Sequence, residues 1–186
     1  MQIDRIFFPA ETLGYGKRII IWTIGCPRRC RGCSNPELWE TDSSREIDTI
    51  ELVQKIEPFL KQADGITITG GDPFFQIDEL RCLLENIRKI SDIEILVYTG
   101  YLYEELTGYQ DVLGKIDVLI DGPYVNERDD NRGIRGSSNQ RIIVLNPKYE
   151  QRYADASLSA RSSQIIQFNG RIINVGIPIK SVIQDS

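Results

Sequence analysis

Short apolar runs alternate with helix-like segments through most of this chain, and this alternation constrains the fold more than any other feature. The runs are rich in Ile and Val and predict strands at Ile3–Phe8, Ile19–Ile24, Ile66–Thr69, Ile95–Tyr98, Val118–Ile120 and Ile142–Leu145. Apolar residues at helical spacing predict helices at Ile47–Gln62 and Gln76–Ile90, with a short one at Leu102–Thr107. In the first of these helices the predicted buried stripe consists of Ile47, Ile50, Val53, Ile56 and Leu60.

Strands that alternate with helices predict parallel pairing through right-handed crossovers. A complete eight-unit barrel needs about 250 residues, whereas this chain has 186. The predicted fold class is therefore α/β, a partial and incomplete parallel β/α barrel. We expect such a barrel to leave an open lateral mouth.

The pattern changes after the last predicted core strand. Residues Asn146–Ser162 are polar and predict irregular structure, and a β-hairpin with a type I′ turn at Asn169-Gly170 is then predicted from Gln164–Phe168 and Arg171–Val175. We expect one domain over residues 1–186, with a core to about residue 145 and a C-terminal extension, 146–186, that carries the hairpin.

Composition and charge narrow the class of protein. The chain is 41% hydrophobic and 26% charged, which is typical of a globular protein, and its net charge of -5 argues against general nucleic-acid binding. It has no apolar run near 18 residues, and Met1–Arg5 does not resemble a secretory signal. We therefore expect a cytoplasmic protein that contacts neither a membrane nor nucleic acid directly.

Three cysteines stand in one loop directly after a predicted strand. Cys26, Cys30 and Cys33 form a Cys-x3-Cys-x2-Cys pattern, which supplies three thiolates to a [4Fe-4S] cube and leaves the fourth iron without a protein ligand. Electron-transfer clusters normally have four cysteine ligands. The chain has no histidine, and its one other cysteine is Cys82. The loop follows a strand, and α/β folds place their chemistry at the carboxyl ends of strands.

The cysteines have two other interpretations. Zinc with Cys82 as the fourth ligand is possible, although zinc modules usually show paired Cys-x2-4-Cys knuckles. A disulfide scaffold is disfavoured because a chain of this length buries enough core without cross-links. Cys82 itself lies within the predicted helix Gln76–Ile90, and free cysteine commonly serves there as a small hydrophobic residue.

Basic residues lie close to the cysteines in sequence: Lys17, Arg18, Arg28, Arg29 and Arg31. One interpretation is a local patch that offsets thiolate charge or attracts an acidic electron donor. The other is an ordinary solvated loop, because surface arginines alone contribute little. The stretch Asn126–Arg135 is also dense in charge and predicts an exposed, mobile loop.

A glycine pair ends the third predicted strand. Ile66–Thr69 is followed by Gly70-Gly71-Asp72-Pro73, and glycines expose backbone polar groups to a ligand without an intervening side chain. On a parallel strand next to the cysteine loop, this turn would face the same pocket.

With these two motifs the chain resembles the radical S-adenosylmethionine superfamily, and within it the activating proteins of anaerobic (class III) ribonucleotide reductases. The likeness runs from about Phe8 to Arg141. It also includes Cys30–Cys33, Val97–Tyr101, Val118–Gly122 and Arg135–Arg141.

The resemblance implies a site that holds a [4Fe-4S] cluster and S-adenosylmethionine. Cys26, Cys30 and Cys33 would bind the cluster, Gly32 and Ser34 would border the adenosyl group, and Gly70, Gly71 and Asp72 would receive the methionine amino group. Asp121 would contact the ribose, although it could equally cap the loop after its strand. Ser137 and Asn139 would line the same mouth.

The resemblance also implies an activity. A flavodoxin- or ferredoxin-type reductant would supply an electron for cleavage of S-adenosylmethionine to a 5′-deoxyadenosyl radical. That radical would take a hydrogen atom from a glycine of a partner glycyl radical enzyme, the anaerobic ribonucleotide reductase. Two alternatives remain at this point: a radical enzyme that modifies another protein or peptide, and a non-catalytic iron–sulfur or zinc module.

Overall fold

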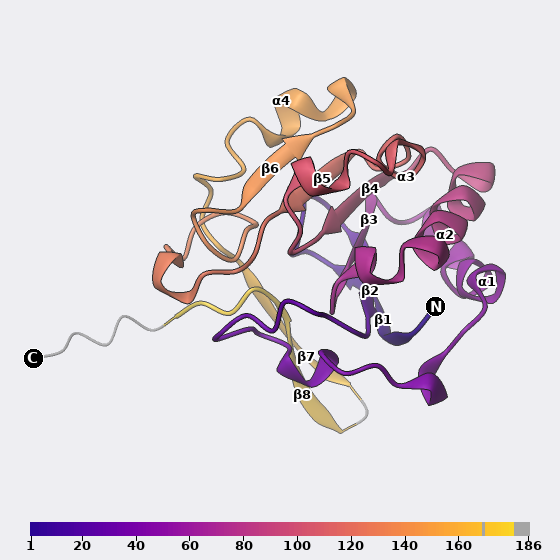
Figure 1. Ribbon diagram of the computed structural model, residues 1–186, viewed down its shortest axis with the longest axis horizontal. Coiled ribbons are helices and arrows are strands. Elements are labelled where there is room, and N and C mark those ends of the chain that lie inside the picture. The colour runs from indigo at the N-terminus through magenta and orange to yellow at the C-terminus, as the bar shows by residue number, and fades with distance from the viewer. Residues whose placement is uncertain (169, 181–186) are drawn as a thin grey trace, which may run out of the picture.

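A six-stranded mixed sheet forms the centre of the molecule in a computed structural model, which describes residues 1–168 and 170–180 (Figure 1). The strands follow one another in space in the order β1-β2-β3-β4-β5-β6. Neighbours from β2 to β5 are parallel, whereas β1 and β6 run antiparallel to β2 and β5. Their bounds are β1 Ile3–Ala10, β2 Arg18–Thr23, β3 Gly65–Gly70, β4 Glu94–Tyr98, β5 Val118–Asp121 and β6 Arg141–Val144.

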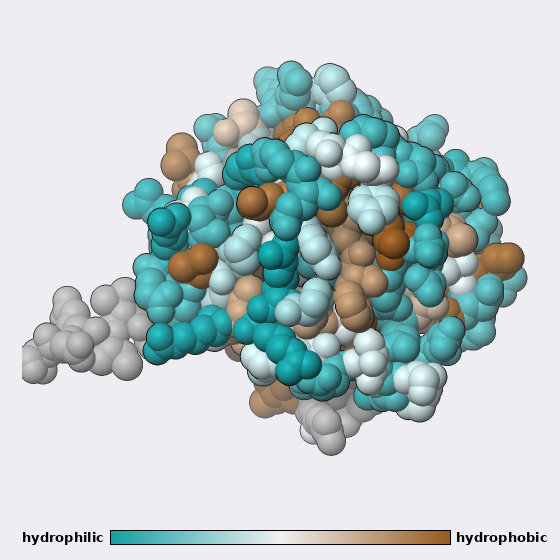
Figure 2. Space-filling model, in the orientation of Figure 1, coloured by the Kyte–Doolittle hydropathy of each residue, from teal (hydrophilic) through white to brown (hydrophobic). Residues whose placement is uncertain are grey.

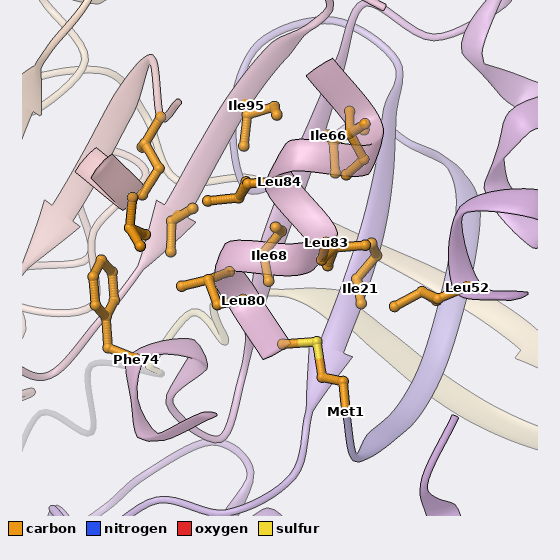
Figure 3. Close-up of a cluster of buried hydrophobic side chains, with 14 of the residues drawn as sticks. Met1, Ile21, Leu52, Ile66, Ile68, Phe74, Leu80, Leu83, Leu84 and Ile95 are labelled. Carbon is orange, nitrogen blue, oxygen red and sulfur yellow. The ribbon is translucent and has the colours of Figure 1, made fainter. Parts of the chain in front are cut away.

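Two helices cover one face of this sheet, α1 (Thr49–Leu60) and α2 (Ile77–Ile90). They connect parallel strands, and their apolar sides pack on alternate residues of β2, β3 and β4 because successive strand residues point to opposite faces. Figure 3 shows part of this cluster, which includes Leu80, Leu83 and Leu84 of α2 and Ile66 and Ile68 of β3.

The second face of the sheet is covered by the C-terminal extension. Short helix α4 (Glu150–Tyr153) packs Tyr153 against Leu96, Val118 and Ile120, together with Tyr149 and Ala156. The hairpin of β7 (Ser163–Phe168) and β8 (Arg171–Gly176) packs against Ile20 and Trp22 of β2. The prediction of irregular structure over Asn146–Ser162 is therefore wrong in part, since this segment contains a helix and buried tyrosines.

The remaining helical segments are short. A turn of α-helix, α3, spans Gln110–Leu113, and the others are 3₁₀ turns: η1 Pro36–Leu38, η2 Ser43–Arg45, η3 Pro73–Gln76, η4 Tyr103–Leu106, η5 Asn126–Arg128 and η6 Pro147–Tyr149. No helix in the described part of the chain is long and apolar enough to cross a bilayer.

The predicted strands and the two long helices are confirmed, and the fold is a mixed α/β fold with a mostly parallel sheet and a C-terminal antiparallel hairpin. The expectation of parallel pairing does not hold for β1 and β6. No α-helix connects either strand to its neighbour in the described chain, and parallel pairing needs a crossover.

Two local predictions need correction, and a third is not tested. Ile50 was placed on the buried side of α1 but is 58% exposed, and Leu52 is buried there together with Val53 and Ile56. The segment Leu102–Thr107 forms a 3₁₀ turn rather than an α-helix. The predicted type I′ turn includes Asn169, which lies outside the described residues.

Candidate functional site: a cavity beside the cysteine loop

A cavity of about 370 Å³ lies at the carboxyl ends of the parallel strands. This volume is within the range of small-molecule sites, about 300–1,000 Å³. The cysteine loop after β2 and the glycine turn after β3 both face it, as expected for neighbouring parallel strands. Of the predicted site residues, it brings together Cys26, Cys30, Gly32, Cys33, Ser34, Gly70, Gly71 and Asp72.

Backbone hydrogen bonds hold the cysteine loop in place. Gly25 N donates to the carbonyl oxygen of Leu38 at 2.8 Å, and Cys26 N donates to that of Trp39 at 2.9 Å. Within the loop, Cys33 N donates to Cys30 O at 3.1 Å. The thiol sulfurs of Cys26, Cys30 and Cys33 therefore project from a backbone that is fixed at its start and tightened between the second and third cysteine.

Burial affects the protonation of two of these thiols. Burial raises the pKa of the Cys26 and Cys30 thiols above 9.0, the ordinary value, because their anions lose solvation. A thiolate at either position therefore needs a nearby positive charge, which a bound metal supplies as it displaces the proton.

In the described chain the three cysteines share one cavity but do not form a single-ion site. Among the residues that the structure describes, no three His, Cys, Asp or Glu side chains converge on a point where a single metal ion could bind. A four-iron cube takes each thiolate on a different iron, so its ligands must lie apart around a shared cavity. All three cysteines belong to the lining of one cavity.

Cys82 is exposed on α2 and does not line the cavity. Its interpretation as a small hydrophobic packing residue is therefore not supported, because its neighbours Leu80, Leu83 and Leu84 form the buried side of the helix and Cys82 does not. Its position also removes the main support for a fourth cysteine ligand.

The glycine turn is shaped by close packing against the neighbouring loop. Gly70 has φ +105°, and a Cβ there would lie 2.5 Å from Thr23 N. A Cβ on Gly71 would overlap the carbonyl oxygen of Gly25. The amides of Gly71 and Asp72 donate to Thr23 O and Gly25 O, at 2.7 and 2.8 Å. Because both amides already donate hydrogen bonds within the protein, the backbone groups of the turn that can bind a ligand are its carbonyl oxygens.

The Asp72 carboxylate connects two strand ends. It is 1% exposed and accepts hydrogen bonds from Phe74 N at 3.1 Å, Thr99 Oγ1 at 2.9 Å and Gly100 N at 2.8 Å. Burial is the dominant cause that raises its pKa to about 6. Asp72 therefore positions the turn after β3 relative to the loop after β4, and its side chain helps to shape the cavity.

Three predicted residues do not line the cavity. The Asp121 carboxylate is buried, pairs with the Arg141 guanidinium and accepts from Tyr103 N at 2.8 Å. Ser137 Oγ accepts from Val125 N at 3.1 Å. Asn139 Nδ2 donates to Pro123 O at 2.8 Å.

The loop arginines do not form a free basic patch. Arg18 is buried at the opposite end of β2, where it pairs with Glu94. In the loop, Arg28 pairs with Glu105 at 2.8 Å, Arg29 with Glu40 at 2.5 Å and Arg31 with Glu127 at 3.5 Å. Each loop arginine thus has an acidic neighbour that offsets its charge.

Sequence reasoning missed one whole wall of the cavity. The missed wall consists of residues of the C-terminal extension: Asn174, Gly176, Ile177, Pro178 and Lys180. In Figure 1 this segment, drawn in yellow, passes beside the purple loop that follows β2. Trp22, Thr69 and Tyr98 contribute from the strands. The amphipathic pattern of the hairpin predicted a packed face but not what it packs against.

A mixed α/β chain with three thiols around one cavity defines the class of single-cluster iron–sulfur proteins. Consistent with this, the family model described as "4Fe-4S single cluster domain" matches residues 12–143.

Comparison with known proteins narrows this class. The anaerobic ribonucleoside-triphosphate reductase-activating protein of Enterobacteria phage T4 is 30% identical over 147 residues, covering 76% of this chain and 93% of that protein. The protein of the same name from Haemophilus influenzae is 31% identical over 145 residues, covering 73% and 94%. The pyruvate formate-lyase-activating enzyme of Staphylococcus aureus is 36% identical over 81 residues, covering 41% and 32%. The chain belongs to the radical S-adenosylmethionine family of activating proteins.

Proposed function

We propose that this chain activates an anaerobic ribonucleoside-triphosphate reductase by making a glycyl radical on it. The observation that carries the proposal is that the three-cysteine loop and the glycine turn face one cavity, in a chain that is similar to such activating proteins over about three quarters of its length. When bound, the [4Fe-4S] cluster and S-adenosylmethionine supply reductive cleavage to a 5′-deoxyadenosyl radical, which takes a hydrogen atom from a glycine.

Cys26, Cys30 and Cys33 would each hold one iron of the cluster. Their positions around a shared cavity support this role. Because the exposed Cys82 does not line the cavity, one iron would be left for the cofactor.

The turn at Gly70, Gly71 and Asp72 would receive the ammonium group of S-adenosylmethionine. An ammonium donates hydrogen bonds and carries positive charge, which suits carbonyl oxygens above the buried Asp72 carboxyl group. Gly32 and Ser34, also on the cavity, would border the adenosyl group.

For Asp121, Ser137 and Asn139 we propose a positioning role. Asp121 holds Tyr103 N and Arg141, and the other two hold the segment from Pro123 to Val125. This segment precedes Asn126 and follows Gly122, and Gly122 and Tyr124 line the cavity. These side chains would therefore act on the cofactor through the loop.

The absence of histidine fits chemistry of this kind, because hydrogen-atom transfer needs positioning and exclusion of water more than an acid–base group.

We also propose that the sheet curves as a partial barrel with the cavity at its open side. Residues 1–186 would act as one domain in the cytoplasm. A flavodoxin- or ferredoxin-type protein would be the reductant.

The test starts from the full chain, reconstituted with iron and sulfide without oxygen. With dithionite and S-adenosylmethionine it should release 5′-deoxyadenosine and methionine. With the anaerobic ribonucleoside-triphosphate reductase of the same organism added, electron paramagnetic resonance should show a glycyl radical. Cys33→Ala should abolish both signals, whereas Cys82→Ala, the matched control, should keep both. Cofactor cleavage without a radical on the reductase would contradict the assigned partner, and no cleavage at all would contradict the chemistry.

A further inference from the structure

The hairpin β7–β8 and the segment that follows it carry a surface that has no role in the proposed function. This segment lies beyond residues 12–143, the part matched by the family model. It nevertheless lines the cavity through Asn174, Gly176 and Lys180. The chain has therefore added a wall to the site that the family core does not include.

This added wall is anchored to the loop that follows β5. Asn131 Oδ1 accepts from Lys180 N at 2.8 Å, and Asn131 Nδ2 donates to Lys180 O at 3.0 Å. A buried ion pair joins Arg161 to Asp129 at 2.8 Å, and Arg161 also donates to Pro178 O at 3.0 Å. The prediction of an exposed, mobile loop at Asn126–Arg135 is therefore wrong for Asp129.

The inner side of the hairpin is packed as a permanent part of the fold. Val175 is 1% exposed, its carbonyl oxygen accepts from Thr12 Oγ1 at 3.2 Å, and Ile166 packs in the same cluster. Substitutions on the outer side of the hairpin can therefore be made without disturbing its attachment.

The outer side presents exposed apolar side chains beside the cavity. Cross-strand pairing places Ile165 opposite Asn174 and Gln167 opposite Ile172, so these residues share one face. Ile165 is 75% exposed and Ile172 is 81% exposed, the two highest values among the described large hydrophobic residues. Figure 2 shows hydrophobic atoms at the lower edge of the molecule, where the hairpin lies.

Asn174 makes this face continuous with the reaction site, because it belongs to the face and also lines the cavity. Hydrogen-atom transfer needs the glycine in contact with the cofactor. A protein that carries this glycine must therefore cover the rim of the cavity. Exposed apolar surface at such a rim is typical of a protein-binding site.

We propose that the outer face of the hairpin, formed by Ile165, Ile172 and Asn174, docks the segment of the reductase that flanks its substrate glycine. This inference rests on the proposed function. The outer face is thereby a specificity element for the protein substrate, and Ile165 and Ile172, which do not line the cavity, contribute nothing to cleavage of S-adenosylmethionine in the absence of the partner.

The double variant Ile165→Glu/Ile172→Glu tests this, because it places two carboxylates on the outer face. In glycyl-radical formation followed by electron paramagnetic resonance, the reductase concentration for half-maximal rate should rise at least tenfold. Release of 5′-deoxyadenosine without reductase should stay within twofold of wild type. Ile50→Glu is the matched control, since Ile50 is 58% exposed on α1, against the other face of the sheet.

Each other result overturns the proposal. An unchanged half-saturating concentration in the double variant would show that the reductase docks elsewhere. Loss of partner-free cleavage would assign the hairpin to the cofactor site instead. A wild-type dimer that the double variant converts to a monomer, with radical formation unchanged, would identify a second copy of the chain as the occupant. Failure of the proposed function is distinct, because wild type and Ile50→Glu would then also give no glycyl radical.

Discussion

The amino and carboxyl ends of the parallel strands differ in the side chains that surround them. At the amino end, Arg18 is buried and donates to Thr67 Oγ1, Ile66 O, Tyr15 O and Glu94 Oε1. At the carboxyl end, glycines and three thiols surround a cavity. Polar groups at the first end are matched to one another, whereas groups at the second end are arranged toward a ligand.

This difference teaches how one sheet separates stability from chemistry. Glu94 also accepts from Arg152 at 2.8 Å and from Tyr153 Oη at 2.5 Å, so the extension completes the network at the amino end. A buried ion pair is costly to break because the remaining charge is left unpaired. Residues at the open end can change with less effect on folding, and the largest effects there should be on activity.

The sharpest contrast is expected from Cys30→Ala. Removing one thiol should abolish cofactor cleavage and lower the amount of iron bound after reconstitution. A cluster that is held by only two cysteines should dissociate more easily from the protein. The free energy of unfolding of the metal-free protein should change by less than about 1 kcal/mol, since the side chain is only partly buried on a loop. Iron analysis and urea unfolding measure both quantities. Cys82→Ala should change neither, and a Cys30→Ala protein with full iron and activity would break the comparison.

The opposite pattern is expected from Arg18→Met. Leaving Glu94 buried without Arg18 should lower the free energy of unfolding by about 3–5 kcal/mol. Protein that remains folded should still bind iron. Lys55→Met is the control, because the Lys55–Glu51 pair is exposed and should contribute less than about 0.5 kcal/mol. A loss below 1 kcal/mol in urea unfolding of Arg18→Met would remove the stabilising role assigned to the amino end.

The buried carboxyl group of Asp72 should give a pH dependence. Its pKa of about 6 in the folded chain lies above the ordinary 3.8, so the native state binds more protons than the unfolded state between these values. Its contribution to stability is therefore full below about pH 4 and falls by about 3 kcal/mol as pH rises through 6.

Unfolding of the metal-free wild type and Asp72→Asn in urea, from pH 4 to pH 7, measures this contribution. The wild type should lose about 3 kcal/mol relative to the variant across that range. Asp78→Asn, at an exposed position in the first turn of α2, controls for removal of a carboxylate. Parallel curves for wild type and Asp72→Asn would contradict the raised pKa.

A smaller effect is expected from Gly71→Ala. The added Cβ would displace Gly25, the residue before Cys26, and should lower the free energy of unfolding by about 1–3 kcal/mol. Iron binding should weaken in parallel. Gly108→Ala is the matched control, because no atom lies within 4 Å of the added Cβ. Equal stability and equal iron content in both variants would show that the close approach of the two loops is not needed.

Much of the fold followed from local pattern. Strands β1 to β6 and helices α1 and α2 were predicted within a few residues, because the spacing of Ile, Leu and Val reports directly which side chains share a face. The pairing direction of β1 and β6 did not follow from that spacing. Nor did the exposure of Ile50, which depends on where α1 meets its neighbours.

The residues of the candidate site also fall into those that the sequence could place and those that it could not. Cysteines and glycines that follow β2 and β3 could be placed together because parallel neighbours end at the same edge. Asp121 could not be placed, because the choice between a ligand and Arg141 depends on a strand 20 residues further along the chain.

The sequence by itself determined the alternation of strands and helices and the three-thiol motif, since both are set by residues close together in the chain. Only the tertiary structure decided that the C-terminal hairpin forms a wall of the cavity. That arrangement depends on contacts such as the one between Thr12 and Val175, which lie 163 residues apart. Hydrophobic spacing identifies a face that will be buried, but the partner of that face is selected by packing across the whole chain.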